Sequence, residues 1–143
     1  MRSSLLLFYF VVLLIGCKSN KLSDSSTKLE GNKFEEVATK KLGEGLTYYK
    51  NDSKTYVLCV HEVPGTNLQP RNSLSFVVIR LKDDKIVLQQ NISGGKVNWF
   101  SDREIEVFRT PGIVRPDESR DDYTTLYNVI TGASYSKKGK ETN

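Results

Sequence analysis

The sequence has little of the chemistry that metal and redox centres require. Its 143 residues include one histidine, two cysteines and a single methionine at position 1. A dedicated zinc site, a Cys/His cluster or a haem with two protein ligands needs more of these side chains. The composition excludes these classes of metalloenzyme, and we expect no metal or organic cofactor. The length fits one small domain.

Alanine is also scarce, with only Ala38 and Ala133, whereas valine and isoleucine after residue 16 number 17. This balance disfavours helices and favours strands. Short β-branched or aromatic runs predict strands at residues 55–63, 74–82, 85–91, 96–100, 104–110 and 123–131. We therefore expect an all-β fold, an antiparallel meander of about seven to nine strands that forms a sandwich or a closed barrel.

The pattern within these runs separates central strands from half-covered ones. Residues 56–60 and 76–79 are apolar at consecutive positions, as in strands that are covered on both faces. Residues 104–110 alternate, with Ile105 and Val107 on one side, so we expect the other side of this strand to meet water. Turn residues predict tight connections at 50–54, 83–84, 93–95 and 101–103.

One long apolar run is present, close to the start of the chain. Residues 5–15 (LLLFYFVVLLI) are 11 consecutive apolar residues that follow the basic Arg2. A helix of this length covers about 16 Å, against roughly 30 Å of hydrocarbon in a bilayer. The run is too short to span and is typical of the apolar region of a secretory signal peptide.

The run ends in Leu14-Ile15-Gly16-Cys17, which resembles the lipobox of bacterial lipoproteins. A thiolate is the nucleophile that thioether formation with a diacylglycerol donor needs, and a small preceding residue gives the peptidase access. The resemblance implies a lipid on Cys17, cleavage between Gly16 and Cys17, and acylation, for example by palmitate. Two or more acyl chains anchor a protein without a spanning helix. An ordinary secretory signal with an incidental cysteine is the alternative.

This interpretation divides the chain into three segments. Residues 1–16 form a signal peptide that is removed, residues 17–32 form the lipidated cysteine and a polar tether, and residues 33–143 form a single β-domain. The tether has a root-mean-square reach of about 20 Å. Lys18 stands where lipoproteins retained in the inner membrane often carry aspartate, so the resemblance implies the outer membrane of a Gram-negative bacterium, facing the periplasm or the cell surface.

The first residues of this β-domain leave one element open. Phe34, Val37, Ala38 and Leu42 recur at helical spacing. A short helix and an edge strand both remain compatible with this segment.

The charge does not indicate a nucleic-acid partner. The formal net charge is +4, and acidic pairs at 83–84 and 121–122 lie among the lysines. A nucleic-acid surface needs dense basic residues interleaved with aromatic ones, which the sequence lacks. We expect a membrane contact through the lipid and an envelope protein or cell-wall partner instead.

Cys59 and His61 are the first residues that could carry chemistry. They lie at i and i+2 of an expected strand, so their side chains share a face, and a thiolate–imidazolium pair is conceivable. The flanking Leu58 and Val60 favour another interpretation, in which Cys59 is a small buried hydrophobe without a disulfide partner. We expect no catalytic residues.

The loop at residues 111–122 (PGIVRPDESRDD) is the second candidate. Its four carboxylates suggest calcium, although the regular spacing of a calcium loop is missing. Its length and the apolar Ile113 and Val114 make it a candidate for contacting a partner, as is the other long loop at residues 64–73.

The third candidate is the turn at residues 131–135 (TGASY), where Gly132 is expected to supply a positive φ. With Tyr135 it resembles the Ser-Gly-x-x-Tyr loop of small β-barrel lipoproteins that inhibit C-type lysozymes, with Thr131 in place of the serine. The paired cysteines of that family are absent, and a plain hairpin is the alternative.

These observations predict a membrane-anchored, non-catalytic envelope lipoprotein whose β-domain binds a partner in an accessory or structural role. Two alternatives remain open at this point. One is an inhibitor or immunity-type protein that blocks an enzyme such as lysozyme with a loop. The other is a lipocalin-like carrier of a small apolar ligand, which needs an open cavity.

Overall fold

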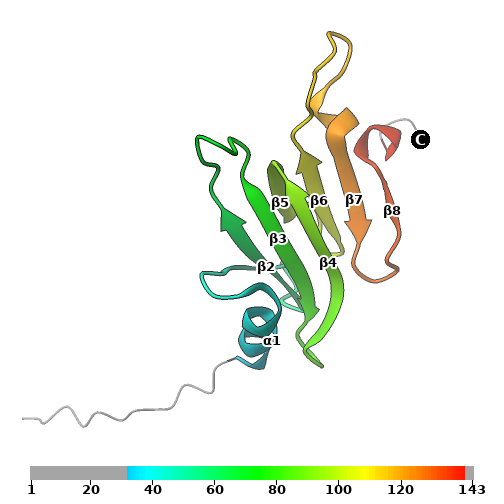
Figure 1. The fold of residues 1–143 in the computed structure, drawn as a ribbon. Coiled ribbons are helices and arrows are strands. Elements are labelled where there is room, and N and C mark those ends of the chain that lie inside the picture. Colours follow the sequence, from blue (N-terminus) through cyan, green and yellow to red (C-terminus); the bar gives the residue numbers. More distant parts are fainter. Residues whose placement is uncertain (1–31, 141–143) are drawn as a thin grey trace, which may run out of the picture.

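The computed structural model describes residues 32–140 of the chain (Figure 1). The expected signal peptide, the lipobox with Gly16 and Cys17, and nearly all of the tether lie outside the described residues. The described part corresponds to the domain that the tether would carry.

The described chain forms one α-helix followed by eight strands and two short 3-10 turns. The helix is α1 (Lys33–Leu42), and the turns are η1 (Arg120–Tyr123) and η2 (Lys137–Lys140). The strands are β1 (Thr47–Lys50), β2 (Tyr56–Val63), β3 (Ser73–Arg80), β4 (Lys85–Ser93), β5 (Gly95–Trp99), β6 (Glu104–Arg109), β7 (Thr124–Asn128) and β8 (Ser134–Ser136). Within the described part, no helix is long and apolar enough to cross a bilayer.

The strands make two antiparallel sheets, each a four-stranded meander, in the order β1-β2-β3-β4 and β5-β6-β7-β8 (Figure 1). The expected all-β class is confirmed, and the architecture is a sandwich with one short helix. The two sheets keep separate strand orders, so of the two forms left open the sandwich is the one observed. The sequence predicted no range for two of the eight strands, β1 and β8, which hold only four and three residues.

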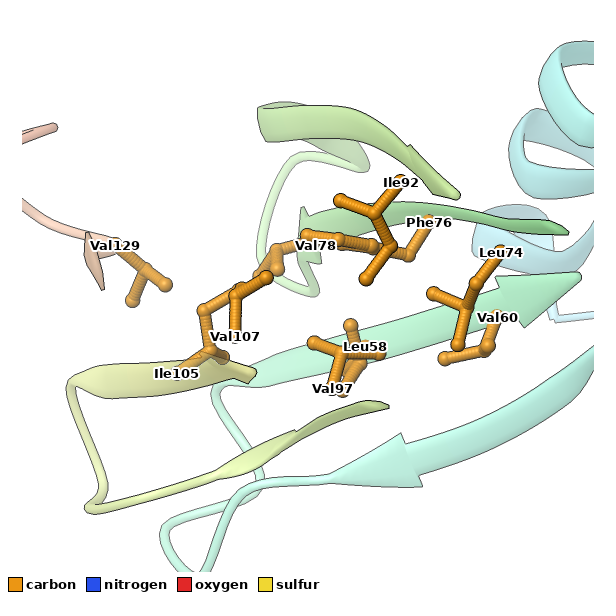
Figure 2. Packing of buried hydrophobic residues seen from close by; sticks show 10 residues of the cluster. All are labelled: Leu58, Val60, Leu74, Phe76, Val78, Ile92, Val97, Ile105, Val107 and Val129. Atoms are coloured by element: carbon orange, nitrogen blue, oxygen red, sulfur yellow. The ribbon is translucent and has the colours of Figure 1, made fainter. Parts of the chain in front are cut away.

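Apolar side chains from both sheets fill the space between them. Figure 2 shows ten of these, which come from β2, β3 and β4 on one side and from β5, β6 and Val129 on the other. In the register of β2 and β3, Leu58 faces Val78 and Val60 faces Phe76, so all four project towards the second sheet. Burial of each large side chain in this layer, such as Phe76, contributes about 1.5–3 kcal/mol to the free energy of unfolding. This layer is therefore the main source of stability.

The other face of the first sheet is covered by α1. Val57, Cys59, Val77 and Ile79 alternate with the inward residues and pack against the buried Phe34 and Ala38 of the helix. This confirms the interpretation of β2 and β3 as strands covered on both faces. It also decides between the two forms left open for residues 34–42, which form the helix α1. Val37 packs with Phe34 and Ala38 against the sheet, whereas a strand would place Val37 on the opposite face from these two residues.

The two sheets meet at a corner made by Gly94 and Gly95, which have φ of 74° and 147°. A Cβ atom on Gly95 would lie 2.1 Å from the carbonyl oxygen of Phe108, on the neighbouring strand. Only glycine allows this close approach of β5 to β6.

The expected strand at 123–131 is wrong in extent, since β7 ends at Asn128. The Asn128 side chain accepts hydrogen bonds from the backbone N–H of Ile130 (3.0 Å) and of Thr131 (3.1 Å). These bonds start a turn, in the manner typical of asparagine.

The outer side of β6 is also less open to water than the alternation predicted. Glu104, Glu106 and Phe108 are half-buried. The C-terminal segment folds over them: Lys137 Nζ lies 2.8 Å from Glu106 Oε1 and 3.1 Å from Asp121 Oδ1, and these bonds raise the pKa of the Lys137 amine. Alternation along one strand carries no information about a segment that returns from 30 residues away.

Candidate binding surface

The connections between strands gather at two opposite ends of the sandwich (Figure 1). The turn end holds the connections at 51–55, 81–84, 100–103 and 129–133. The loop end holds the long connections at 64–72 and 110–119, together with the Gly94 corner. The helix starts near the turn end, because Lys33 Nζ lies 3.8 Å from Asp84 Oδ2 in the 81–84 turn.

The first long loop, residues 64–72, holds Leu68 at its tip with 97% of the side chain exposed. Below the tip, Thr66 and Gln69 exchange two backbone hydrogen bonds, at 2.7 and 3.1 Å. Gly65 is enclosed as well, since a Cβ there would lie 2.4 Å from the carbonyl oxygen of Pro70. A closed turn thus presents a leucine to solvent.

The second long loop, residues 110–119, carries Ile113 and Val114, which are 84% and 64% exposed. The Tyr123 hydroxyl donates to a Glu118 carboxylate oxygen and, at 3.4 Å, to the carbonyl of Ile113. The bond to Glu118 also raises the pKa of the Tyr123 hydroxyl. The predicted partner-contacting pair therefore lies on a loop whose base is attached to the rest of the domain.

Arg71 joins the two loops. Its guanidinium donates to the carbonyl of Thr110 at 3.3 Å and to the carbonyl of Pro111 at 3.2 Å. Leu68, Ile113 and Val114 are thereby carried on neighbouring loops at one end of the molecule. We call these three side chains and Arg71 the loop-end surface.

The carboxylates of the second loop do not converge. The described residues contain no group of three or more His, Cys, Asp or Glu side chains arranged to hold a metal ion. Glu118 binds Tyr123, and Asp122 accepts a bond from Lys138 at 2.5 Å. The calcium hypothesis for residues 111–122 gains no support from this arrangement.

Cys59 is fully buried between α1 and the first sheet, and it is a free cysteine. Burial raises the pKa of its thiol to about 12. His61 lies further along β2, where the side chain is half-buried. A thiol that is protonated and enclosed by Phe34 and Ala38 has no access to a substrate, so these positions support the interpretation of Cys59 as a packing residue.

The turn at 131–135 is a hairpin between β7 and β8, and Gly132 has the expected positive φ of 74°. Tyr135 is half-buried and its hydroxyl donates to a Glu104 carboxylate oxygen. The structure therefore places Gly132 and Tyr135 at the opposite end from Ile113 and Val114, and it binds the tyrosine to the domain rather than presenting it.

The sequence marked the loop at 64–73 as a candidate and indicated no single residue in it. Leu68 and Arg71 belong to the surface because of where the loop lies, and the only signals were its length and its prolines, Pro64 and Pro70. Comparison of the chain with protein-family models, with curated proteins and with solved structures finds no significant match. The function must therefore be inferred from the surfaces of the domain itself.

Proposed function

We propose that this protein is a lipid-anchored, non-catalytic binding module of the bacterial envelope, held through Cys17 and engaging a protein partner with the loop-end surface. The observation that carries the proposal is the presence of three large aliphatic side chains, 64–97% exposed, on two loops joined by Arg71. The buried core of a protein interface is more apolar than the rest of a protein surface, and arginine is enriched there.

The orientation of the domain agrees with this role. The helix begins at the turn end, so the chain that leads from the lipidated cysteine proposed at position 17 would reach the domain from that side. The loop-end surface lies at the other end and would project away from the anchoring membrane. The polar tether with its reach of about 20 Å would give the domain freedom to meet a partner.

Leu68 favours a second candidate, an inhibitor or immunity-type protein. A closed turn that presents one almost fully exposed leucine is suited to insertion into the cleft of another enzyme, because little conformational entropy is lost on binding. In this version the 64–72 loop is the inserted segment, in place of the 131–135 turn. The carrier hypothesis gains no support, since apolar side chains fill the space between the sheets (Figure 2).

The test is site-specific photo-crosslinking in cells, with the photoreactive amino acid placed at position 68 or, as the matched control, at position 130. Ile130 is also an exposed aliphatic side chain, at 55%, but it lies at the turn end. We expect one dominant adduct from position 68 and none of that mass from position 130. Ile113→Ser should weaken the adduct, and Cys17→Ala should abolish it by releasing the protein from the membrane.

Equal labelling from both positions, or an adduct indifferent to Ile113→Ser, would contradict the use of the loop end. An adduct that survives Cys17→Ala would contradict the anchor. Once the partner is identified, its activity with and without the purified protein separates the two candidates, because an inhibitor lowers that activity and an accessory subunit does not.

A further inference from the structure

A pocket of about 620 Å³ opens at the turn end, between connections that are far apart in the sequence. Its walls come from the 51–55 turn, the 81–84 turn with the end of β3, the 100–103 turn and the 129–133 turn. Four of its ten lining residues are lysine or arginine and one is aspartate: Lys54, Arg80, Lys82, Arg103 and Asp102. The pocket is therefore cationic, although the formal charge of the whole chain is only +4.

The walls of this pocket are joined to one another by hydrogen bonds. Asn51, which is 3% exposed, donates through its side chain to the carbonyl of Asp102 at 2.9 Å and accepts from the N–H of Thr55 and of Tyr56, both at 2.9 Å. The N–H of Val129 donates to the carbonyl of Arg103 at 2.9 Å. The pocket thus exists before any ligand arrives, which lowers the entropy cost of binding.

The positive charges of the pocket differ in how they are compensated. Arg80 binds Asp83 through two hydrogen bonds, at 2.9 and 2.7 Å. Asp102 accepts the N–H of Ser53 at 2.8 Å, a bond that lowers the pKa of this carboxyl. By contrast, Lys54, Lys82 and Arg103 make no side-chain hydrogen bond or ion pair within residues 32–140.

Lys54 stands in a conformation that lysine rarely adopts, with φ of 54°. A non-glycine side chain is strained in this left-handed region, and glycine or asparagine would fit with less strain. Glycine would relieve this strain but would also remove the positive charge that Lys54 brings to the pocket.

We propose that this pocket binds a phosphate group through Lys54, Lys82 and Arg103, and that the headgroup of an anionic phospholipid supplies it. The lipid source rests on the proposed anchoring, whereas the phosphate chemistry does not. Within residues 32–140 these three cations form no direct hydrogen bond or ion pair, although Lys82 attracts Asp83 and Arg103 attracts Asp102. Cations without a bonded partner around a preformed pocket are suited to a phosphate group. The exposed Ile130 at its rim adds an apolar contact, which a membrane surface accepts and a free anion does not use.

The position of the pocket agrees with this source. Lys33, at the start of α1, contacts Asp84 in the turn next to the pocket-lining Lys82. A chain anchored through position 17 would thus bring the turn end, rather than the loop end, towards the bilayer. The anionic surface would then orient the domain and direct the loop-end surface outwards.

The test is lysine footprinting of the full lipidated chain in nanodiscs, with amine acetylation read by mass spectrometry. One set of discs contains only zwitterionic phosphatidylcholine and the other also contains phosphatidylglycerol. We expect Lys54 and Lys82 to react about fivefold more slowly in the anionic discs, since one cation near such a surface is worth about that factor. Lys85, an exposed lysine at the same end but outside the pocket, and Lys40 on the helix should react at unchanged rates.

A second arm adds inorganic phosphate or glycerol 1-phosphate to the chain in phosphatidylcholine discs. Protection of Lys54 and Lys82 in this arm assigns the site to a soluble phosphate, whereas protection only in anionic discs assigns it to the lipid. Arg103→Gln should remove most of the protection in the arm that shows it, and Arg115→Gln, an exposed arginine of the loop end, should leave it intact.

Equal protection of Lys85 and Lys54 would overturn the proposal, because it would show general surface attraction without a pocket. Absence of protection in both arms, or full protection in Arg103→Gln, would overturn it as well. Failure of the chain to co-elute with the discs would count against the anchor, and the soluble-phosphate arm would then decide the pocket on its own.

Discussion

The two ends of the sandwich differ in the length of their connections and in the hydrogen bonds that hold these connections. The turn end has four connections of four or five residues, and hydrogen bonds join each of them to a neighbouring connection or strand end. The loop end has two connections of nine or more residues, joined mainly through Arg71 and the Gly94 corner. The short turns are cross-bonded through their backbone and carry charged side chains, whereas the long loops carry aliphatic side chains out into solvent. The rigid end therefore suits a small ligand group, and the extended end suits a macromolecular partner.

The largest effect on stability is expected at Gly95, in the corner that joins the two sheets at the loop end. Gly95→Ala places a Cβ 2.1 Å from the Phe108 carbonyl oxygen, so β5 must move away from β6. We expect a loss of about 3 kcal/mol in the free energy of unfolding, measured by chemical denaturation. The control is Gly132→Ala, where the added Cβ meets nothing within 4 Å and only the positive φ resists it. Equal losses would mean that backbone strain, and not the close approach, governs Gly95.

Removal of the buried Asn51 side chain should break the cross-bonding of the turn end. Asn51→Ala leaves the N–H groups of Thr55 and Tyr56 and the carbonyl of Asp102 without this partner. We expect a loss of about 2 kcal/mol. Asn72→Ala removes an exposed bond to Glu62 and two bonds to Gly95 at the loop end. It should cost less because the two bonds to Gly95 are long, at 3.4 and 3.3 Å. A larger loss for Asn72→Ala in the same denaturation series would reverse the comparison of the two ends.

Acid should destabilise the domain, in part through Asp102 at the turn end. Hydrogen bonding to Ser53 lowers the pKa of Asp102 in the folded chain. A carboxyl with a lowered folded pKa adds stability above its unfolded pKa of about 3.9, and that stability is lost as pH falls through the folded value. We expect the unfolding midpoint to decrease below about pH 4, and Asp102→Asn to flatten part of this decrease.

The lowered pKa values of Asp83 and Asp122 account for further acid sensitivity in the same direction. Asp117→Asn, a change at an exposed carboxylate of the second long loop, is the matched control for Asp102→Asn. An identical pH profile for Asp102→Asn and the unmodified chain would show that this contact does not contribute.

The smallest effect on stability is expected from Arg71→Ala. Its two hydrogen bonds are exposed, so the free energy of unfolding should change by less than about 0.5 kcal/mol. The loops should nevertheless separate, and hydrogen–deuterium exchange should become faster at residues 112–116 while the turn end stays unchanged. Arg103→Ala, a change at an exposed arginine of the turn end, serves as the control. Unchanged exchange in Arg71→Ala would remove the argument that the two loops form one surface.

Particular residues show how far sequence reasoning reaches. The consecutive apolar residues of β2 and β3 predicted two covered faces, and both faces are covered. The prediction succeeded because a strand that is buried on both faces needs apolar residues at consecutive positions. The alternation in β6 predicted one face in water, yet Lys137 and Tyr135 cover it, because that cover is supplied by a distant segment. Ile113 and Val114 were recognisable as exposed from their loop, but Leu68 was not selected, because nothing in its local sequence marks it.

By itself the sequence determined the all-β class, the central strands and the tight connection at 93–95, and it predicts an anchor at Cys17. These features are local, because the periodicity of a strand, a glycine turn and a lipobox-like motif each depend on only a few neighbouring residues. Only the tertiary structure decided that Arg71 holds the Thr110 and Pro111 carbonyls, and that Lys54, Lys82 and Arg103 line one pocket. The physical reason is that strand pairing and sheet packing bring together connections that are tens of residues apart, and no local pattern encodes which of them meet.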